Sequence, residues 1–252
     1  MEFQSSMKAL IIGDSCTDVY LYGNCQRLCP DAPVPVFVPL YQKDNKGMAG
    51  NVYQNLVSLG IPAVLKTNNN AVVKTRYVEE KTNHMLLRVD SGEERVTRMS
   101  GLTVEFLKSF TVVVISDYNK GFLHKEDIRF ICENHPLVFI DTKKIIGDYC
   151  KECSYIKINS EEHRKSFEEI NNQSEEWANK KMIVTLGSGG SVFDGKKYSV
   201  SQVEIKDTSG AGDTFLAGLV YEYLKGEDIY KAMEFANKCA TKVVQMKGVN
   251  VI

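Results

Sequence analysis

The sequence has almost no excess of charge of either sign. Its 252 residues include 31 basic and 32 acidic side chains, which gives a formal net charge of −1. Nothing in this overall charge draws the chain toward nucleic acid or an acidic membrane surface. It has no uninterrupted apolar run long enough to cross a bilayer. Its first seven residues lack the basic region and apolar core of a signal peptide, so we expect a cytoplasmic protein.

The cysteines and histidines form no clear metal-binding pattern. Seven cysteines, an odd number, are spread through the chain and favour reduced thiols over disulfides. Cys25 with Cys29 and Cys150 with Cys153 are closely spaced pairs, so a zinc site with four thiolates is an alternative. The two pairs lie far apart in the chain, however, and neither sits in a glycine-rich knuckle. The four histidines have no ligand spacing.

Short apolar, β-branched runs alternate with helical patterns along most of the chain. The predicted strands are residues 8–12, 111–115, 137–140, 155–158 and 182–186, and the predicted helices lie around 125–133, 161–177, 211–224 and 228–245. Another helix is indicated by Val52, Leu56 and Leu59, with Gly60 as its C-cap. Continuous apolar strands are typical of parallel sheets covered on both faces. We therefore expect an α/β fold, a doubly wound and mostly parallel sheet, in a single domain over residues 1–252.

Polar side chains follow four of the predicted strands. They are Asp14, Asp117 (after Ser116), Asp141 and Asn159. In doubly wound sheets the carboxyl ends of the strands carry the chemistry. This repetition predicts one functional site along one edge of the sheet.

Two segments, at about residues 15–42 and 71–92, break the alternation and predict a small β lid outside the main sheet. The second contains a hairpin that turns at Lys81-Thr82-Asn83.

The predicted hairpin brings two arginines together. With Glu80 opposite His84, Arg76 faces Arg88, and Lys74 faces Asp90. Like charges directly opposite each other are unfavourable unless an anion lies between them, so Arg76 and Arg88 are candidates for gripping a substrate phosphate. The alternatives are a register shifted by one residue and arginines splayed into solvent.

The most informative motif is Asp207-Thr208-Ser209-Gly210-Ala211-Gly212-Asp213, which runs directly into an apolar helical stretch. Small residues at a helix start leave backbone N–H groups unpaired at the positive end of the helix dipole, which makes an anion cradle. The carboxylate of Asp213 would repel the ligand of a simple anion trap. In phosphoryl transfer, however, it can accept the proton of an attacking hydroxyl. The alternative is a plain helix start whose dipole Asp213 complements.

Two common nucleotide motifs are not supported. Residues 190–197 nearly fit G-x-x-x-x-G-K-[ST], but Lys197 has no hydroxyl for Mg²⁺, and Val192-Phe193 is typical of a strand. The glycines at 187–190 and 210–212 lack the final glycine of G-x-G-x-x-G. We therefore expect neither a P-loop nor a Rossmann dinucleotide site.

The chain resembles the ribokinase-like (PfkB) carbohydrate kinases over most of its length. Four motifs carry the resemblance, in the family's order: residues 47–51 resemble the sugar-binding G-G-x-x-N, 159–162 the N-x-x-E, 185–190 the T-x-G-x-x-G turn, and 207–213 the D-T-x-G-A-G-D signature. Within the family the likeness is closest to the D-glycero-β-D-manno-heptose 7-phosphate kinase domains of ADP-heptose synthases. That likeness is carried by Gly13-Asp14 with Asp18 and Tyr20, and by residues 27–35, 74–76, 87–90 and 116–121.

The resemblance implies an ATP-dependent sugar kinase that transfers the γ-phosphoryl group to a hydroxyl, expected to be the anomeric hydroxyl of a heptose 7-phosphate. It implies that Asp213 is the base, and that the N–H groups of Gly210, Ala211 and Gly212 hold the phosphoryl group. The implied sugar-side residues are Asp14, Asp18, Gly47, Asn51, Arg76, Arg88 and Lys120, and the nucleotide-side residues are Asn159, Glu162, Thr185, Gly187, Gly190 and Asn237. Mg²⁺ would be held through water by Glu162, and Asp207 marks a candidate site for a monovalent cation such as K⁺.

Several of these residues also have purely structural interpretations. Asp14 could cap a strand end, Asn51 could be a helix N-cap, and Asn159 with Glu162 could form a simple helix start. Lys120 could be a solvated surface side chain.

The sequence departs from the family pattern at three places. Met48 stands where members usually have a second glycine, Cys29 replaces a serine, and the chain is a few dozen residues short between Gly60 and Lys74, where typical members have another strand and helix. No nucleotidyltransferase half, which bifunctional relatives possess, is expected in this chain.

These departures leave two other functions open: a kinase of the same family for another sugar, and a non-catalytic, kinase-like protein that binds sugar or nucleotide. Lid strands in this fold often pair between subunits, so we expect a homodimer. We expect no nucleic-acid or membrane partner.

Overall fold

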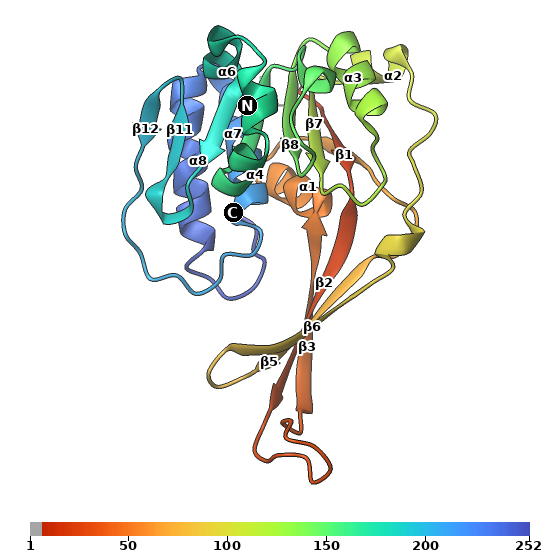
Figure 1. Ribbon diagram of the computed structural model, residues 1–252, viewed down its shortest axis with the longest axis vertical. Coiled ribbons are helices and arrows are strands. Elements are labelled where there is room, and N and C mark those ends of the chain that lie inside the picture. The colour runs from red at the N-terminus through yellow and green to blue at the C-terminus, as the bar shows by residue number, and fades with distance from the viewer. Residues whose placement is uncertain (1–6) are drawn as a thin grey trace.

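The computed structural model describes residues 7–252 and contains two β-sheets (Figure 1). The larger sheet has eight strands in the order β12-β11-β10-β9-β8-β7-β1-β4. From β4 to β10 neighbouring strands are parallel, whereas β10, β11 and β12 are antiparallel. This arrangement, with helices on both faces, confirms the predicted α/β, mostly parallel fold.

The elements of the larger sheet agree closely with the predicted alternation. Its strands are β1 (Ala9–Gly13), β4 (Ala63–Lys66), β7 (Val112–Asp117), β8 (Val138–Thr142), β9 (Tyr155–Asn159), β10 (Met182–Thr185), β11 (Ser191–Phe193) and β12 (Lys196–Tyr198). The longer helices are α1 (Ala49–Ser58), α3 (Lys125–Asn134), α7 (Ala211–Gly226) and α8 (Ile229–Val243), and α2 (Val104–Lys108) is a short one. The strand β11 covers Val192-Phe193, as expected from its apolar character.

The two faces of the larger sheet bury separate apolar clusters. Ile11 of β1 belongs to the cluster that includes residues of α1, α7 and α8. Its neighbour Ile12 belongs to the cluster on the opposite face, with residues of α2 and α3. This alternation follows from the two-residue period of a strand, and because both faces are covered the strand is apolar throughout.

The predicted helix over 161–177 is wrong, because the segment forms three short helices. These are α4 (Ser160–Lys165), α5 (Phe167–Asn171) and α6 (Glu175–Lys181). Ser166 is buried and its hydroxyl accepts the N–H of Ile146 at 3.1 Å. Ser174 caps α6 by accepting the N–H of Trp177 at 3.1 Å. A serine that bonds locally to the backbone, as Ser174 does, competes with a continuous helix. Ser166, the C-cap of α4, instead bonds to a residue 20 positions earlier.

The smaller sheet projects away from the larger one (Figure 1). It consists of β2 (Ser15–Asn24), β3 (Val38–Met48), β5 (Val73–Glu79) and β6 (His84–Ser91), in the order β3-β2-β5-β6. The central pair β2 and β5 is parallel, and the two outer pairs are antiparallel. These strands occupy the segments in which lid strands were predicted.

The register of the β5–β6 hairpin is close to the predicted one. Arg76 lies opposite Arg88 and Lys74 lies opposite Asp90, as predicted. Glu79, not Glu80, pairs with His84, because the register shifts by one residue between Tyr77 and Val78. This bulge changes the pairing only at the turn end of the hairpin, so Arg76 still lies opposite Arg88 as predicted.

The short stretch between Gly60 and Lys74 contains one strand, β4, at the edge of the larger sheet. From β4 the chain passes through residues 67–72 directly into β5. Over residues 7–252, no helix combines the length and the apolar character needed to span a membrane.

Candidate active site

The polar residues that follow the strands lie along one edge of the larger sheet, as predicted. Asp14, after β1, accepts the backbone N–H of Tyr118, which follows β7, at 2.9 Å. Asp141, in β8, forms an ion pair with Lys157 of β9 at 2.5 Å. Because the parallel strands are in register, their carboxyl ends bring these groups together.

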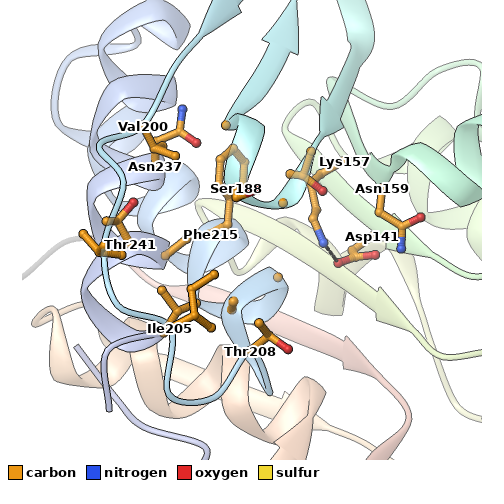
Figure 2. Close-up of a pocket in the computed structure, with 18 of the residues that line it drawn as sticks. Asp141, Lys157, Asn159, Ser188, Val200, Ile205, Thr208, Phe215, Asn237 and Thr241 are labelled. Carbon is orange, nitrogen blue, oxygen red and sulfur yellow. Dashed lines mark hydrogen bonds and ion pairs between the residues drawn. The ribbon is translucent and has the colours of Figure 1, made fainter.

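A pocket of about 380 Å³ opens beside this edge (Figure 2). One wall is the strand edge with Asp141, Lys157 and Asn159. The opposite wall is α8, and the N-terminus of α7 forms part of the lining through Ala211 and Gly212. The pocket therefore adjoins the helix start that was predicted to hold an anion.

At the two glycines at the start of α7, an added side chain would meet a neighbouring side chain at close range. Gly210 has φ 77°, a left-handed conformation that favours glycine, and an added Cβ would lie 2.6 Å from the Nδ2 of Asn51. At Gly212 a Cβ would lie 2.9 Å from the Nζ of Lys157. The glycines thus let an amide and an ammonium group approach the helix terminus closely.

Asp213 lies in the first turn of α7 and is 3% exposed. Its Oδ1 accepts the hydroxyl of Tyr118 at 2.7 Å, and its Oδ2 accepts the Nδ2 of Asn51 at 3.1 Å. Burial raises the pKa of Asp213 to about 6, although the bond from Tyr118 acts in the opposite direction. Such a pKa suits a general base near neutral pH.

Asn51 is not a helix N-cap, so that structural interpretation is wrong. It lies inside α1, whose N-cap is Met48. Its Nδ2 contacts both Asp213 and the carbonyl of Gly210, at 3.4 Å, and so links α1 to the start of α7. Met48 has φ 58°, a conformation that costs a residue with a side chain more than glycine, which accounts for the usual glycine at this position.

The contacts of Asp14 fit its structural interpretation, in which the carboxylate caps backbone groups at the end of a strand. Its carboxylate accepts the backbone N–H groups of Tyr118, Lys120 and Phe122, at 2.9, 3.2 and 3.3 Å. Burial and the nearby charge of Asp117 raise the pKa of Asp14, and the bonds from Lys120 and Phe122 oppose the rise. Asp14 therefore fixes the loop that carries Tyr118 and Lys120.

Asp18, Gly47 and Arg76 lie together where the smaller sheet meets the site. The guanidinium of Arg76 forms an ion pair with Asp18, and both side chains are largely buried. A Cβ at Gly47 would lie 2.1 Å from the Oδ2 of Asp18, so glycine lets β3 pass directly against this carboxylate.

Carboxylates neutralise the other predicted phosphate ligands as well. Arg88 donates two hydrogen bonds to Asp90, at 2.7 and 2.6 Å, and these bonds lower the pKa of Asp90. Lys120 pairs with Glu93 at 2.5 Å. Arg76 and Arg88 therefore face each other without needing an anion between them, because Asp18 and Asp90 supply the opposing charge.

Asn159 and Glu162 form a capping box at the start of α4. The side chain of each accepts the backbone N–H of the other at 2.8 Å. Glu162 also pairs with Lys143, and Asn159 lines the pocket. The helix-start interpretation is therefore correct for the pair, and Asn159 at the same time faces the space in which a nucleotide was expected.

The other nucleotide-side residues also line the pocket. They are Thr185, Gly187, Gly190 and Asn237. Asn237 donates to the hydroxyl of Ser191 at 2.9 Å, which fixes its amide in the pocket wall. Gly190 has φ 87°, and an added Cβ would lie 2.0 Å from the carbonyl oxygen of Tyr198.

Asp207 anchors the loop before α7. Its Oδ1 accepts the N–H of Ser209 at 2.8 Å, and its Oδ2 accepts the N–H of Gly248 at 3.1 Å. Both carboxylate oxygens thus have backbone partners.

The cysteine pairs do not assemble a metal site in the part of the chain that the structure describes. No group of three or more His, Cys, Asp or Glu side chains within residues 7–252 is arranged to hold a metal ion. Cys150 and Cys153 are buried in the apolar cluster on the α3 face of the larger sheet.

Two residues of the site were missed by the sequence interpretation. Lys157 lies over Gly212 in the pocket, and a charged residue inside the apolar run 155–158 was a signal that could have revealed it. Tyr118 was included only as part of a motif, and no local pattern indicates that its hydroxyl would reach Asp213, 95 residues away.

Comparisons with known proteins agree with this geometry. Residues 8–251 match the family described as "pfkB family carbohydrate kinase". The chain is 30% identical over 289 residues to the bifunctional protein HldE of a Nitratiruptor species, an alignment that covers 96% of this chain. The chain spans 62% of the length of that relative.

Solved structures of low sequence identity share the fold. Arabidopsis thaliana ribokinase, complexed with ribose and ATP, matches with a TM-score of 0.69 and 16% identity, over 96% of this chain and 94% of that one. Phosphofructokinase-2 from Escherichia coli, in complex with potassium, matches with a TM-score of 0.70 and 12% identity, over 98% and 95%.

Proposed function

Because the chain belongs to the pfkB family of carbohydrate kinases, we propose that it transfers the γ-phosphoryl group of ATP to the anomeric hydroxyl of a heptose 7-phosphate. The observation that carries this proposal is the position of Asp213, a buried carboxylate with a pKa of about 6, directly after Gly210-Ala211-Gly212. The heptose is supported by the likeness to the HldE protein and by the motifs that resemble heptose 7-phosphate kinase domains.

In this proposal the pocket of about 380 Å³ holds ATP, with its phosphates toward Ala211 and Gly212. The backbone N–H groups at the start of α7 would offset charge that develops on the transferring phosphoryl group. Lys157, whose ammonium lies over Gly212, would add a positive charge at the same place. Asp213 would take the proton of the sugar hydroxyl.

The residues around the pocket suit Mg²⁺. The Oδ1 of Asp141 is buried and has no hydrogen-bond partner among residues 7–252. Carboxylate and amide oxygens are the hard donors that Mg²⁺ prefers. Glu162, Asn159 and Asp141 would hold the ion, directly or through water, and its chemistry would be to neutralise charge on the phosphate oxygens.

We assign the sugar to the side of Asp213 that faces the smaller sheet. Asn51 and Asp18, next to Gly47, offer an amide and a carboxylate for sugar hydroxyls. Asp14 would affect sugar binding only indirectly, because its carboxylate fixes the loop that carries Tyr118. Arg76 is our candidate for the substrate phosphate, since it lines a cavity between the smaller sheet and residues 205–209.

The proposal also includes a monovalent cation and a homodimer. A monovalent cation such as K⁺ would bind backbone carbonyls near Asp207, because the carboxylate of Asp207 already holds two N–H groups. A cytoplasmic homodimer would form through the smaller sheet, where exposed apolar side chains lie on the edge strands β3 and β6. They are Val38, Leu40, Met85, Leu87 and Val89.

One observation favours a non-catalytic, kinase-like binding protein as the second candidate. Asp213 is 3% exposed, and both of its oxygens already have donors. A kinase must open this contact to admit a hydroxyl, whereas a binding protein need not.

The experiment that separates these functions is ATP consumption with a panel of sugars and their 5-, 6- and 7-phosphates. We expect D-glycero-β-D-manno-heptose 7-phosphate to give the highest kcat/KM. If another sugar gave the highest kcat/KM, the proposed substrate would be wrong and the proposed kinase activity would stand. Nucleotide binding without turnover on any sugar would favour the binding protein.

A further inference from the structure

The phenol of Tyr118 covers the carboxylate of Asp213. Its hydroxyl donates to the Oδ1 at 2.7 Å, in the position where an acceptor hydroxyl would have to donate. The pocket of about 380 Å³ is lined by Tyr118, Ala211 and Gly212, and Asp213 is not among its lining residues. A molecule in this pocket therefore meets Tyr118 before it meets Asp213.

The main chain and the side chain of Tyr118 are held by different carboxylates, Asp14 and Asp213. The Tyr118 N–H donates to the Oδ2 of Asp14, and the N–H groups of Lys120 and Phe122 donate to the same carboxylate. The ring itself is half-buried, with the ammonium groups of Lys74 and Lys143 at 6.0 and 5.2 Å from its centroid. The ring also packs against the cluster of Cys16, Met48 and Val72. Opening the site to a sugar hydroxyl therefore requires the bond from the phenol to Asp213 to break, while the bonds that hold the loop can remain.

A kinase with a general base beside its phosphate site faces competition from water. If a water molecule occupied the position of the acceptor, its oxygen would form a bond to the γ-phosphorus of ATP. The bond from that phosphorus to the bridging oxygen of ADP would break, and the proton of the water would pass to Asp213. Inorganic phosphate and ADP would form without any sugar product.

We propose that Tyr118 is a positioning residue that excludes water from Asp213 until the sugar hydroxyl displaces it. This inference rests on the proposed kinase function. The phenol can fill the place of water without reacting as water does, because burial and the neighbouring carboxylate raise its pKa well above the ordinary value and keep it protonated. The displaced hydrogen bond is replaced by the one that the sugar hydroxyl donates.

The decisive variant is Tyr118→Phe, which keeps the ring and leaves a space the size of a hydroxyl next to Asp213. We expect sugar-free ATP hydrolysis to rise about tenfold or more relative to wild type, since a positioned base accelerates such a step. The matched control is Tyr149→Phe, which removes another buried phenol hydroxyl, in the apolar cluster on the α3 face. It should leave the hydrolysis rate unchanged.

A second variant tests whether the gained hydrolysis uses Asp213. In Tyr118→Phe combined with Asp213→Asn, the gain should disappear. Hydrolysis that stays at the wild-type rate in Tyr118→Phe, or that persists in the double variant, would overturn the inference. The proposed function is judged separately by sugar phosphorylation in the wild type, so a failure of the role of Tyr118 can be distinguished from a failure of the kinase proposal.

Discussion

The ammonium group of Lys157 lies 2.5 Å from the Oδ2 of Asp141, and both side chains are almost completely buried in the pocket wall (Figure 2). A buried ion pair needs additional partners to offset the loss of water. Here the Oδ1 of Asp141 has no hydrogen bond within the described chain, and Lys157 lies over the start of α7. In the proposed complex, the Oδ1 of Asp141 is therefore available to a metal ion and the ammonium of Lys157 to a phosphate.

Lys157→Met should therefore weaken ATP binding by about tenfold or more, because a buried charge-assisted contact to phosphate is lost. Isothermal titration calorimetry with ATP measures this. The variant also removes the closer ion-pair partner of Asp141, leaving only Lys143 at 3.9 Å, and should lower the melting temperature. Lys157→Met combined with Asp141→Asn should recover much of the stability and none of the affinity. Recovery of ATP affinity in the double variant would show that Lys157 acts only through folding.

Gly212→Ala should impair catalysis far more than stability. Its new Cβ would meet the Nζ of Lys157 at 2.9 Å, and the flexible end of a lysine can move aside. We expect the free energy of unfolding to change by less than about 1 kcal/mol and kcat/KM to fall by about a hundredfold, the loss typical of a disturbed oxyanion site. Gly226→Ala is the control, because it lies in the same helix and a Cβ there meets nothing within 4 Å. Equal kinetics in both variants would contradict the phosphate role of Gly212.

The pH dependence of kcat/KM should report Asp213. As a base it must be ionised, so with a pKa of about 6 the rate should fall roughly tenfold per pH unit below that value. The groups that set this pKa, besides burial, are Tyr118, Asn51, Asp141 and Lys157. Tyr118→Phe removes a bond that lowers the pKa, so its acidic limb should move to higher pH. A limb that stays in place would show that another group titrates.

The same pKa affects stability with a definite sign. The folded pKa of Asp213 lies above its ordinary value of 3.8, so the folded state binds the proton more tightly than the unfolded state. Its contribution to the free energy of unfolding is therefore largest below about pH 4 and declines until about pH 6. Urea unfolding across this range should show the decline in wild type and lose it in Asp213→Asn.

Arg76→Ala should raise KM for a phosphorylated sugar much more than for its unphosphorylated counterpart. Arg76 is largely buried beside the site, whereas Arg88 is 41% exposed and held by Asp90, so Arg88→Ala serves as the matched control with a smaller effect. Steady-state kinetics on the two sugars measures the difference. Equal effects on both sugars would remove Arg76 from phosphate recognition and leave it as the partner of Asp18.

The sequence was sufficient to predict the strands β1, β7, β8, β9 and β10 of the larger sheet because they are largely buried. The edge strands β4 and β12 are more exposed and were not predicted. The residues 112–115 of β7 are all apolar and buried, and the polar residues Asp141 and Asn159 lie at one edge of the sheet as expected. The helix expected over 161–177 is divided into three, because Ser174 caps α6 through a local bond and Ser166, the C-cap of α4, bonds to the distant N–H of Ile146.

The partners of the site residues could not be predicted from local patterns. The alternative that Asn51 is an N-cap was wrong because α1 begins earlier, directly after Met48. The left-handed backbone of Met48 sets this start, and no periodic pattern in the sequence reveals it. The facing arginines were placed correctly, but Asp18, which neutralises Arg76, comes from a different strand 58 residues earlier. Contacts across such separations depend on how the smaller sheet assembles, and sequence spacing carries no information about them.

The most direct test of the proposed mechanism follows the product of ATP and D-glycero-β-D-manno-heptose 7-phosphate by ³¹P NMR, in wild type and in Asp213→Asn. We expect a new sugar 1-phosphate signal with wild type. In the variant the rate of its formation should fall by about a thousandfold, the typical contribution of a general base, while ATP still binds. Formation of that product by Asp213→Asn at a rate close to wild type would contradict the role of Asp213 as the base, and with it the mechanism.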